Sequence, residues 1–270
     1  MKHYIDQQDR RIKRISFGHD RWYSPDSGIW NERYMSEKKD VLTRGRNNQE
    51  LRIIIANLPR HCRTILDAPC GYGRISNLLA SKNYQLVGID INKYFIRIAQ
   101  QDATQRRNSV RYLVGNILTK QINKKFDAVL NIFTSIGYLE TEEKNELLIK
   151  KLCNYVKPGG RLIIETMNPI AMFRRYEERS NKVTNDGKVF SFRRYYDYKT
   201  ATMTTRVRET RSKKLKFSGA HIIRLYFPHE LVEICNKYGC EIDQILDQRG
   251  HDGDIMDSLR MWLIFTKRKQ

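Results

Sequence analysis

Residues 65–76, Ile-Leu-Asp-Ala-Pro-Cys-Gly-Tyr-Gly-Arg-Ile-Ser, decide the fold. They join an apolar strand ending in Asp67 to a glycine turn at Gly71 and Gly73, and then to a helix-forming run. The next apolar strand, YQLVGID, ends in Asp90. A strand, a glycine turn, a helix and a second strand ending in a carboxylate make a mononucleotide-binding half, in which the second carboxylate accepts hydrogen bonds from ribose hydroxyls. The pattern therefore predicts a nucleoside cofactor.

Asp67 argues against a dinucleotide. A carboxylate at this position would repel the pyrophosphate that a dinucleotide places on the following helix N-terminus, and it would attract an amino acid ammonium. The GxGxxG spacing of a dinucleotide site is also absent, because Ser76 stands where the third glycine would be. The residues favour a nucleoside that carries an amino acid.

The segment DAPCGYG resembles the first motif of the class I S-adenosylmethionine (SAM) methyltransferases, acidic-x-G-x-G-x-G. Pro69 takes the place of the first glycine, as in the DxPCGxGR variant common among the small-molecule enzymes of this superfamily. Later segments match the superfamily's order. They are expected strands at 110–117, 125–133 and 161–165, a helix at 141–156, and the recurrent signature KPGGRLIIE.

The resemblance implies an α/β fold with a Rossmann-like seven-stranded core, an N-terminal helical lid and an inserted antiparallel β cap. We expect the lid at residues 1–60, the SAM-binding core at 61–171 and 227–270, and the cap at 172–226. The cap segments FSFRRYYDYK, TATMTTRVRETR and KFSGAHIIRLYF are rich in Tyr, Phe, Thr, Val and Ile, which favours strands. Such a sheet can shape an acceptor pocket or mediate homodimer formation, and the sequence favours neither.

The same resemblance implies the residues that contact SAM. It puts Asp67 at the methionine ammonium, Asp90 on the ribose and Asn116 near the adenine. The full expected set is Asp67, Cys70, Gly71, Gly73, Arg74, Asp90, Ile91, Asn116, Ile117, Asn131 and Phe133. The lid adds aromatic residues that either wall the methyl-donor pocket, where ring faces favour a sulfonium, or pack as a hydrophobic seam: Trp22, Tyr23, Trp30 and Tyr34.

Methyl transfer needs an aligned acceptor and no dedicated nucleophile. Tyr138 is the first candidate to touch the acceptor, since it ends the turn FTSIGY after the fourth expected strand. This turn resembles that of the amino-sugar N,N-dimethyltransferases, some of which carry His at this position. A Tyr hydroxyl with its usual pKa of ~10 orients better than it accepts protons. His221 in the insertion is a second candidate, as a proton acceptor, and either residue can instead be structural.

The net charge of +20 bears on the partner. The basic excess is concentrated in residues 173–216, which suits an anionic substrate or RNA, although a solvated surface also explains it. The turn Asn131-Ile132-Phe133-Thr134 is not the [ND]-P-P-[YF] turn of enzymes that methylate exocyclic base amines. This difference makes nucleic acid the less favoured partner.

Cysteine usage and hydropathy indicate the compartment. The five cysteines are odd in number and form no CxxC pair, so neither a disulfide framework nor a metal site is expected. No apolar run reaches transmembrane length, and the basic N-terminus lacks the apolar core of a signal peptide. We therefore expect a cytoplasmic protein without a membrane partner.

Three functions follow from these observations. The leading one is an enzyme that methylates a nitrogen or oxygen atom of a small molecule or peptide, with SAM as the donor. The second is a tRNA or rRNA methyltransferase that uses the basic insertion. The third is a SAM-binding regulatory protein without catalysis.

Overall fold

The computed structural model describes residues 30–38, 41–185, 187–211 and 214–269, and the side chains of 211–218 are left aside. Seven strands form a sheet in the order β10-β11-β5-β4-β1-β2-β3. The first five strands run parallel, and β11 is antiparallel to β5 and β10. The strands are β1 (Thr64–Asp67), β2 (Gln85–Asp90), β3 (Val110–Val114), β4 (Phe126–Asn131), β5 (Val156–Met167), β10 (Cys240–Leu246) and β11 (Arg260–Lys267). The predicted α/β core is confirmed.

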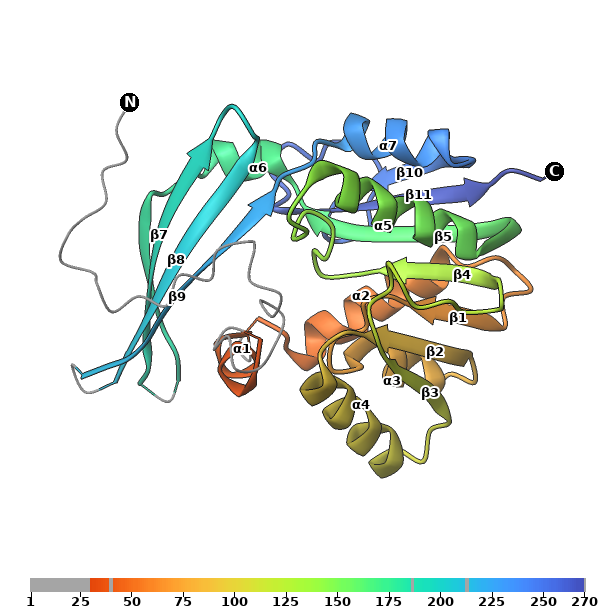
Figure 1. Cartoon of the computed structure of the whole chain (residues 1–270), viewed down its shortest axis with the longest axis horizontal. Helices are drawn as coiled ribbons and strands as arrows, with labels where there is room; N and C mark the ends of the chain where they lie inside the picture. Colours follow the sequence, from red (N-terminus) through yellow and green to blue (C-terminus); the bar gives the residue numbers. More distant parts are fainter. Residues whose placement is uncertain (1–29, 39–40, 186, 212–213, 270) are drawn as a thin grey trace.

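Helices cover both faces of this sheet, which is why its strands are apolar on both sides. Leu66 and Val129 pack on one face beneath α5 and α7, whereas Ile65 and Ala128 pack on the other beneath α2 and α3 (Figure 1). The helices are α1 (Glu32–Lys38), α2 (Arg44–Ala56), α3 (Arg74–Ala80), α4 (Lys93–Gln105), α5 (Glu142–Tyr155), α6 (Pro169–Arg174) and α7 (Pro228–Lys237). In the described ranges, no helix has both the length and the apolar character needed to cross a bilayer.

Two helices, α1 and α2, lie within the described part of the segment that precedes the core. Helix α2 begins at Arg44, because the Thr43 side chain accepts a hydrogen bond from the main-chain N–H of Arg46 and so caps it. Helix α1 lies before this cap and has no buried residue. Trp22 and Tyr23 lie outside the described residues.

A second sheet of four antiparallel strands has the order β6-β7-β8-β9 and is called the cap sheet here. Its strands are β6 (Arg179–Val183), β7 (Val189–Asp197), β8 (Thr202–Arg211) and β9 (Lys214–Arg224). Three of these follow the Tyr- and Thr-rich segments seen in the sequence. Strand β6, RSNKV, gave no strand signal, because an edge strand that pairs only with β7 can be almost entirely polar.

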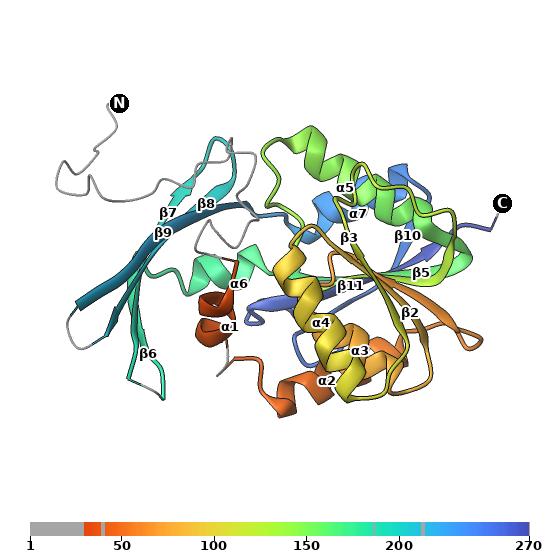
Figure 2. The same ribbon diagram turned by 60° about the horizontal axis from the view of Figure 1, so that its bottom comes forward.

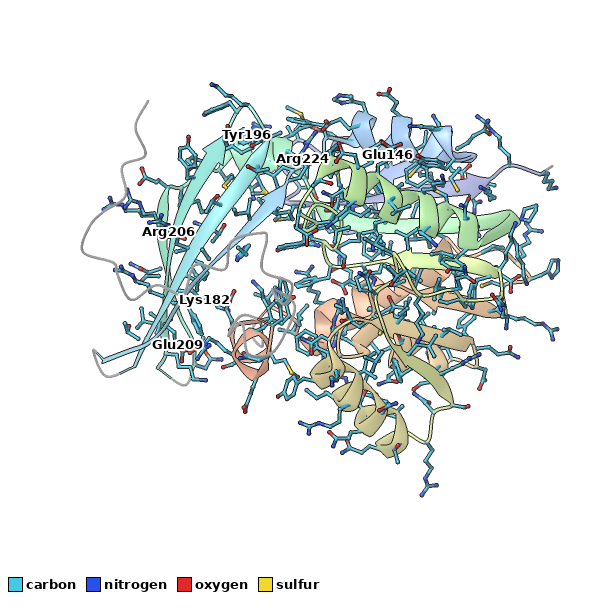
Figure 3. The ribbon with its side chains drawn as sticks, in the orientation of Figure 1. Glu146, Lys182, Tyr196, Arg206, Glu209 and Arg224 are labelled. Atoms are coloured by element: carbon cyan, nitrogen blue, oxygen red, sulfur yellow. The ribbon has the colours of Figure 1, made fainter. Side chains whose placement is uncertain are left out.

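The cap sheet stands beside the core with α1 between them, as both views show (Figures 1 and 2). Arg224, at the end of β9, joins the two parts (Figure 3). It forms an ion pair with Glu230 of α7, and its Nε lies 3.5 Å from Oε2 of Glu142 on α5. Its guanidinium carbon is 4.5 Å from the ring centre of Tyr226. These contacts fix the cap sheet where the chain returns to the core.

Candidate active site

A cavity opens at the carboxyl ends of β1, β2 and β4, where ligands bind in open α/β sheets. We call it the strand-end cavity. It holds about 920 Å³ of space, open solvent included. Its lining is Trp30, Tyr34, Leu42, Asp67, Pro69, Cys70, Gly71, Tyr72, Arg74, Ile75, Asp90, Ile91, Asn92, Phe95, Ile132, Phe133, Thr134, Ser135 and Tyr138.

Most of the residues predicted to contact a cofactor meet in this cavity. Those that line it are Asp67, Cys70, Gly71, Arg74, Asp90, Ile91 and Phe133. Those outside its lining are Gly73, Asn116, Ile117 and Asn131. The Asn116 side chain accepts a hydrogen bond from the N–H of Leu118, and Asn131 donates to the main-chain oxygen of Ala68. Both amides thus shape the backbone of neighbouring turns.

Gly73 has a packing role. Its φ is +76°, and a Cβ there would lie 2.4 Å from Oη of Tyr112 and 2.6 Å from Cβ of Ala99. Only glycine therefore lets α3 begin this close to β3 and α4.

Two buried carboxylates belong to the strand-end cavity. Asp67 accepts a hydrogen bond from Oγ of Ser76 at 2.5 Å, and Asp90 accepts from the N–H groups of Gly71 and Asn92, each at 2.8 Å. Burial raises the pKa of Asp67 to about 7 and that of Asp90 to about 6. Neither forms an ion pair with a basic side chain in the described part of the chain. Each is suited to a cationic or hydroxyl-bearing ligand.

The turn after β4 has an unusual backbone. Phe133 and Thr134 are consecutive non-glycine residues at φ values of +67° and +60°. Glu165 on β5 holds both, because its Oε2 accepts from the N–H of Phe133 at 2.7 Å and its main-chain oxygen accepts from that of Thr134 at 3.0 Å. Arg260 on β11 pairs with Glu165 and donates from Nη2 to Oγ1 of Thr134 at 2.7 Å. Such strain persists only where neighbouring groups enforce it, and it is concentrated at functional sites.

The sequence did not single out Glu165 and Arg260. The available signal was one charged residue at the end of each apolar strand, RLIIE and RMWLIF, with opposite signs. Their pairing depends on β11 lying antiparallel beside β5.

Helix α2 is attached to the glycine-turn motif through Glu50, which is 3% exposed. Glu50 pairs with Arg46 of α2 at 2.6 Å and with Arg74 of α3 at 2.5 Å. The guanidinium carbons of Arg46, Arg74 and Arg260 lie 5.2, 5.7 and 4.8 Å from the ring centre of Phe133. The turn after β4 is therefore enclosed by charge pairs from α2, α3 and β11.

Of the aromatic residues expected in the lid, Trp30 and Tyr34 lie within the described residues. The rings of Trp30 and Tyr34 are 4.9 Å apart, and Trp30 packs edge-on against Tyr138 at 5.4 Å. Nδ2 of Asn92 donates to the main-chain oxygen of Trp30 at 2.8 Å. These two rings pack against each other and also wall the strand-end cavity.

A second cavity, the cap cavity, lies between the cap sheet and the core and holds about 1100 Å³, open solvent included. It shares Trp30, Tyr34, Phe133, Thr134 and Tyr138 with the strand-end cavity. Its other lining residues are Arg33, Glu37, Lys38, Met167, Met172, Phe192, Arg194, Met203, Thr205, Val207, His221, Ile223 and Arg260. Both predicted acceptor-side residues thus line one cavity.

Tyr138 and His221 approach each other with ring centres 6.0 Å apart. Burial raises the pKa of Tyr138 well above its usual value, so its hydroxyl stays protonated. Burial, together with the positive charges of Lys38 and Arg194, lowers the pKa of His221 to about 4. At neutral pH the pair offers a hydroxyl that can donate a hydrogen bond and an uncharged imidazole that can accept one.

Gly137 makes this approach possible. Its φ is +98°, and a Cβ would lie 2.2 Å from the carbonyl oxygen of Arg224. The N–H of Arg224 donates to the oxygen of Gly137 at 2.9 Å. The turn that ends in Tyr138 is therefore pressed against the end of β9.

Comparisons with known proteins agree with this geometry. Residues 65–160 match a family model described as a methyltransferase domain. A ubiquinone biosynthesis O-methyltransferase of Coxiella burnetii is 30% identical over 124 residues, 45% of this chain and 51% of that protein. A putative methyltransferase of Bacillus subtilis is 29% identical over 140 residues, 49% and 53% of the two chains. The chain spans about half the length of these curated relatives.

Solved structures are similar over most of the chain. A SAM-dependent methyltransferase from Clostridium acetobutylicum superposes with a TM-score of 0.73 at 15% identity, covering 88% of this chain and 97% of that one. A SAM-bound amino pentose methyltransferase from Micromonospora echinaspora, involved in calicheamicin biosynthesis, gives 0.67 at 18% identity, covering 87% and 96%. At these identities the likeness shows the fold. Residues 65–160 thus match a methyltransferase domain, and the chain has the Rossmann-like fold of the class I SAM-dependent methyltransferases.

Proposed function

We propose that this protein is an enzyme that transfers a methyl group from SAM to a nitrogen or oxygen atom of a small molecule or peptide in the cap cavity. The observation that carries the proposal is the shared wall of the two cavities, formed by Trp30, Tyr34, Phe133, Thr134 and Tyr138. A donor held in the strand-end cavity would meet an acceptor in the cap cavity across this wall. The similar proteins include one named as a ubiquinone biosynthesis O-methyltransferase and one named as an amino pentose methyltransferase, and these names support a small-molecule acceptor.

The residues of the strand-end cavity fit SAM. Asp67 would bind the methionine ammonium and Asp90 the ribose hydroxyls, because these two buried carboxylates lack a cationic partner among the described side chains. The faces of Trp30 and Tyr34 would suit a sulfonium. When bound, SAM supplies a methyl group on a positively charged sulfur, which is an activated leaving group.

We propose that Tyr138 and His221 orient the methyl acceptor. The Tyr138 hydroxyl donates to the acceptor, and the neutral imidazole of His221 accepts from an acceptor N–H or O–H, which turns a lone pair toward the shared wall. Orientation of this kind can lower the activation free energy of a bimolecular reaction by roughly 7–11 kcal/mol. With a pKa of about 4, His221 is a weak base, so orientation is its main task.

The test is cofactor binding followed by turnover. Calorimetry should detect binding of SAM and S-adenosylhomocysteine to the full chain, and fractionated small-molecule extracts should yield S-adenosylhomocysteine with SAM. Failure to bind either compound would overturn the proposal. Binding without turnover on any fraction would favour the regulatory alternative, and turnover on tRNA or rRNA alone would favour the RNA methyltransferase.

Compartment and assembly belong to the same proposal. We assign the protein to the cytoplasm, on the odd number of cysteines and the five free thiols. Homodimer formation through the cap sheet stays a prediction, and sedimentation analysis of the full chain tests it.

A further inference from the structure

Arg194 of β7 carries a positive charge that no carboxylate of the described residues neutralises within ion-pair distance. Its Nη1 donates to Oγ of Ser180 at 2.8 Å and to the main-chain oxygen of Glu177 at 3.2 Å. Its guanidinium carbon lies 5.3 Å from the ring centre of Phe192. These contacts anchor one end of the guanidinium. The Nε and Nη2 groups have no hydrogen-bond partner in the described part of the chain.

The other cations that line the cap cavity are paired with carboxylates. The pairs are Arg33 with Glu209 at 2.6 Å, Lys38 with Glu37 at 2.7 Å, and Arg260 with Glu165 at 2.6 Å; Glu209 is labelled in Figure 3. Within the described lining, the uncompensated charge is therefore that of Arg194.

Arg194 also stands at the boundary with a third cavity, the outer cavity, which holds about 1090 Å³, open solvent included. The residues common to the cap and outer cavities are Lys38, Phe133, Met167, Met172, Arg194 and Arg260. A ligand that occupies both cavities would therefore contact residues of this shared set, Arg194 and the two methionines among them.

Resting on the proposed function, we propose that Arg194 binds an oxyanion of the methyl acceptor, a carboxylate or phosphate group, while the apolar part of the acceptor lies against Met167 and Met172. The Nε–H and Nη2–H groups lie on one edge of the guanidinium and match two oxygens of an oxyanion. The cavity excludes part of the water that would screen this pair.

The neighbouring residue supplies a matched control. Successive side chains of a strand point to opposite faces. Arg193 therefore points away from the cap cavity; its side chain is 54% exposed, and its Nε lies 3.2 Å from Glu178. Arg193→Gln removes the same charge from the same strand without touching the cavity.

In the experiment, the full chain is first saturated with S-adenosylhomocysteine. Phenyl phosphate and benzoate are then titrated separately into this complex, and calorimetry measures their affinities at low and high ionic strength. Loss of two charge-assisted hydrogen bonds in Arg194→Gln should weaken binding of the matching probe at least about tenfold. Arg193→Gln should change it less than about twofold. Arg194→Lys, which keeps the charge and loses the fork, should fall between them. Preference for phenyl phosphate or for benzoate identifies the oxyanion.

If Arg193→Gln and Arg194→Gln weakened probe binding equally, the binding would depend on the general positive charge of the surface, and the proposal would be overturned. Wild-type protein that binds S-adenosylhomocysteine but neither probe would also overturn it, while leaving the proposed function in place. Absence of S-adenosylhomocysteine binding would instead remove the proposed function. If a short single-stranded RNA displaced phenyl phosphate and depended equally on Arg194, the site would belong to a nucleic acid, which contradicts a small acceptor.

Discussion

Glu165 of β5 and Arg260 of β11 form an ion pair that holds the left-handed turn at Phe133 and Thr134. The side chain of Glu165 is 1% exposed and that of Arg260 is 15% exposed, so most of the pair is removed from water. The two residues are far apart in sequence, and adjacent strands bring them together beside the wall shared by the two cavities.

Glu165→Gln should therefore be costly. Breaking a buried pair leaves an uncompensated guanidinium, with an expected loss of about 3–5 kcal/mol in unfolding free energy. Urea denaturation measures it. The control is Arg268→Ala, which breaks the exposed pair with Glu241 and should cost at most about 1 kcal/mol. Similar losses in both variants would show that the buried pair has no special weight.

Asp90→Ala should weaken S-adenosylhomocysteine binding. Each lost charge-assisted hydrogen bond to a ribose hydroxyl is worth about 1.5–3 kcal/mol before compensation. Calorimetry on purified variants measures the effect. Asn116→Ala is the informative companion, since Asn116 lies outside the lining of the strand-end cavity. Affinity unchanged in Asp90→Ala would remove this carboxylate from the cofactor site.

The affinity for SAM should fall as the pH drops through about 7. Binding an ammonium requires ionised Asp67, whose pKa is raised to about 7 by burial, so protonation competes with the cofactor. Calorimetry between about pH 8 and about pH 6 should show the decline. Asp67→Asn should bind more weakly at every pH and lack this inflection. An unaltered inflection in that variant would assign it to another group.

The Asp67 carboxyl should also make the unfolding free energy of the cofactor-free protein depend on pH. The folded pKa of Asp67 lies above the unfolded value of ~3.9, so the native state binds more protons between these limits. Its contribution to stability is present below about pH 4 and is lost as the pH rises through about 7. Comparing the pH dependence of unfolding in the wild type and in Asp67→Asn isolates this contribution.

Gly137→Ala should destabilise the protein and lower turnover, because its Cβ would meet the carbonyl oxygen of Arg224 at 2.2 Å. Gly253→Ala is the matched control, since Gly253 has a φ of +122° but no atom within 4 Å of an added Cβ. The control should show backbone strain alone, roughly 1–3 kcal/mol. A larger loss in Gly137→Ala by thermal or urea unfolding measures the close approach, and equal losses would argue against it.

Tyr138→Phe should lower turnover about tenfold with cofactor affinity nearly intact, the pattern of a hydroxyl that acts mainly in the transition state. The measurement needs an acceptor fraction that supports turnover, together with calorimetry for S-adenosylhomocysteine. Unchanged turnover would leave Tyr138 as a wall residue.

Local sequence patterns predicted most of the expected cofactor-contacting residues that line the strand-end cavity. Asp67, Gly71 and Asp90 follow strands that the sequence marks by apolar runs, and parallel strands bring their carboxyl ends to one edge. The position of Asn116 was harder to derive, because its side chain caps the turn to Leu118 and does not line the cavity. A strand pattern gives the place of a residue along the chain and leaves its rotamer open.

Contacts between residues that are distant in the sequence could not be predicted from local patterns. Tyr138 and His221 were named separately, yet their meeting depends on Gly137 lying against β9. The basic excess of residues 173–216 suggested an anionic partner, but it did not separate Arg193 from Arg194. The strand register separates these residues, with Arg194 lining the cap cavity and Arg193 outside its lining.

The attachment of α1 has a kinetic consequence. Helix α1 has no buried residue, and ion pairs and hydrogen bonds hold it to the cap sheet, Arg33 to Glu209 and Lys182 to the main-chain oxygen of Glu37 among them. Helix α2, by contrast, is fixed to α3 through buried Glu50. If the strand-end cavity holds the cofactor as proposed, release of α1 would free its ring contacts with the cavity while α2 and the sheet stay in place. Salt screens ion pairs that water reaches, and the side chains of Arg33 and Glu209 are 27% and 10% exposed, so the dissociation rate of S-adenosylhomocysteine should rise modestly with ionic strength. Salt would then act on residence time as well as on acceptor binding.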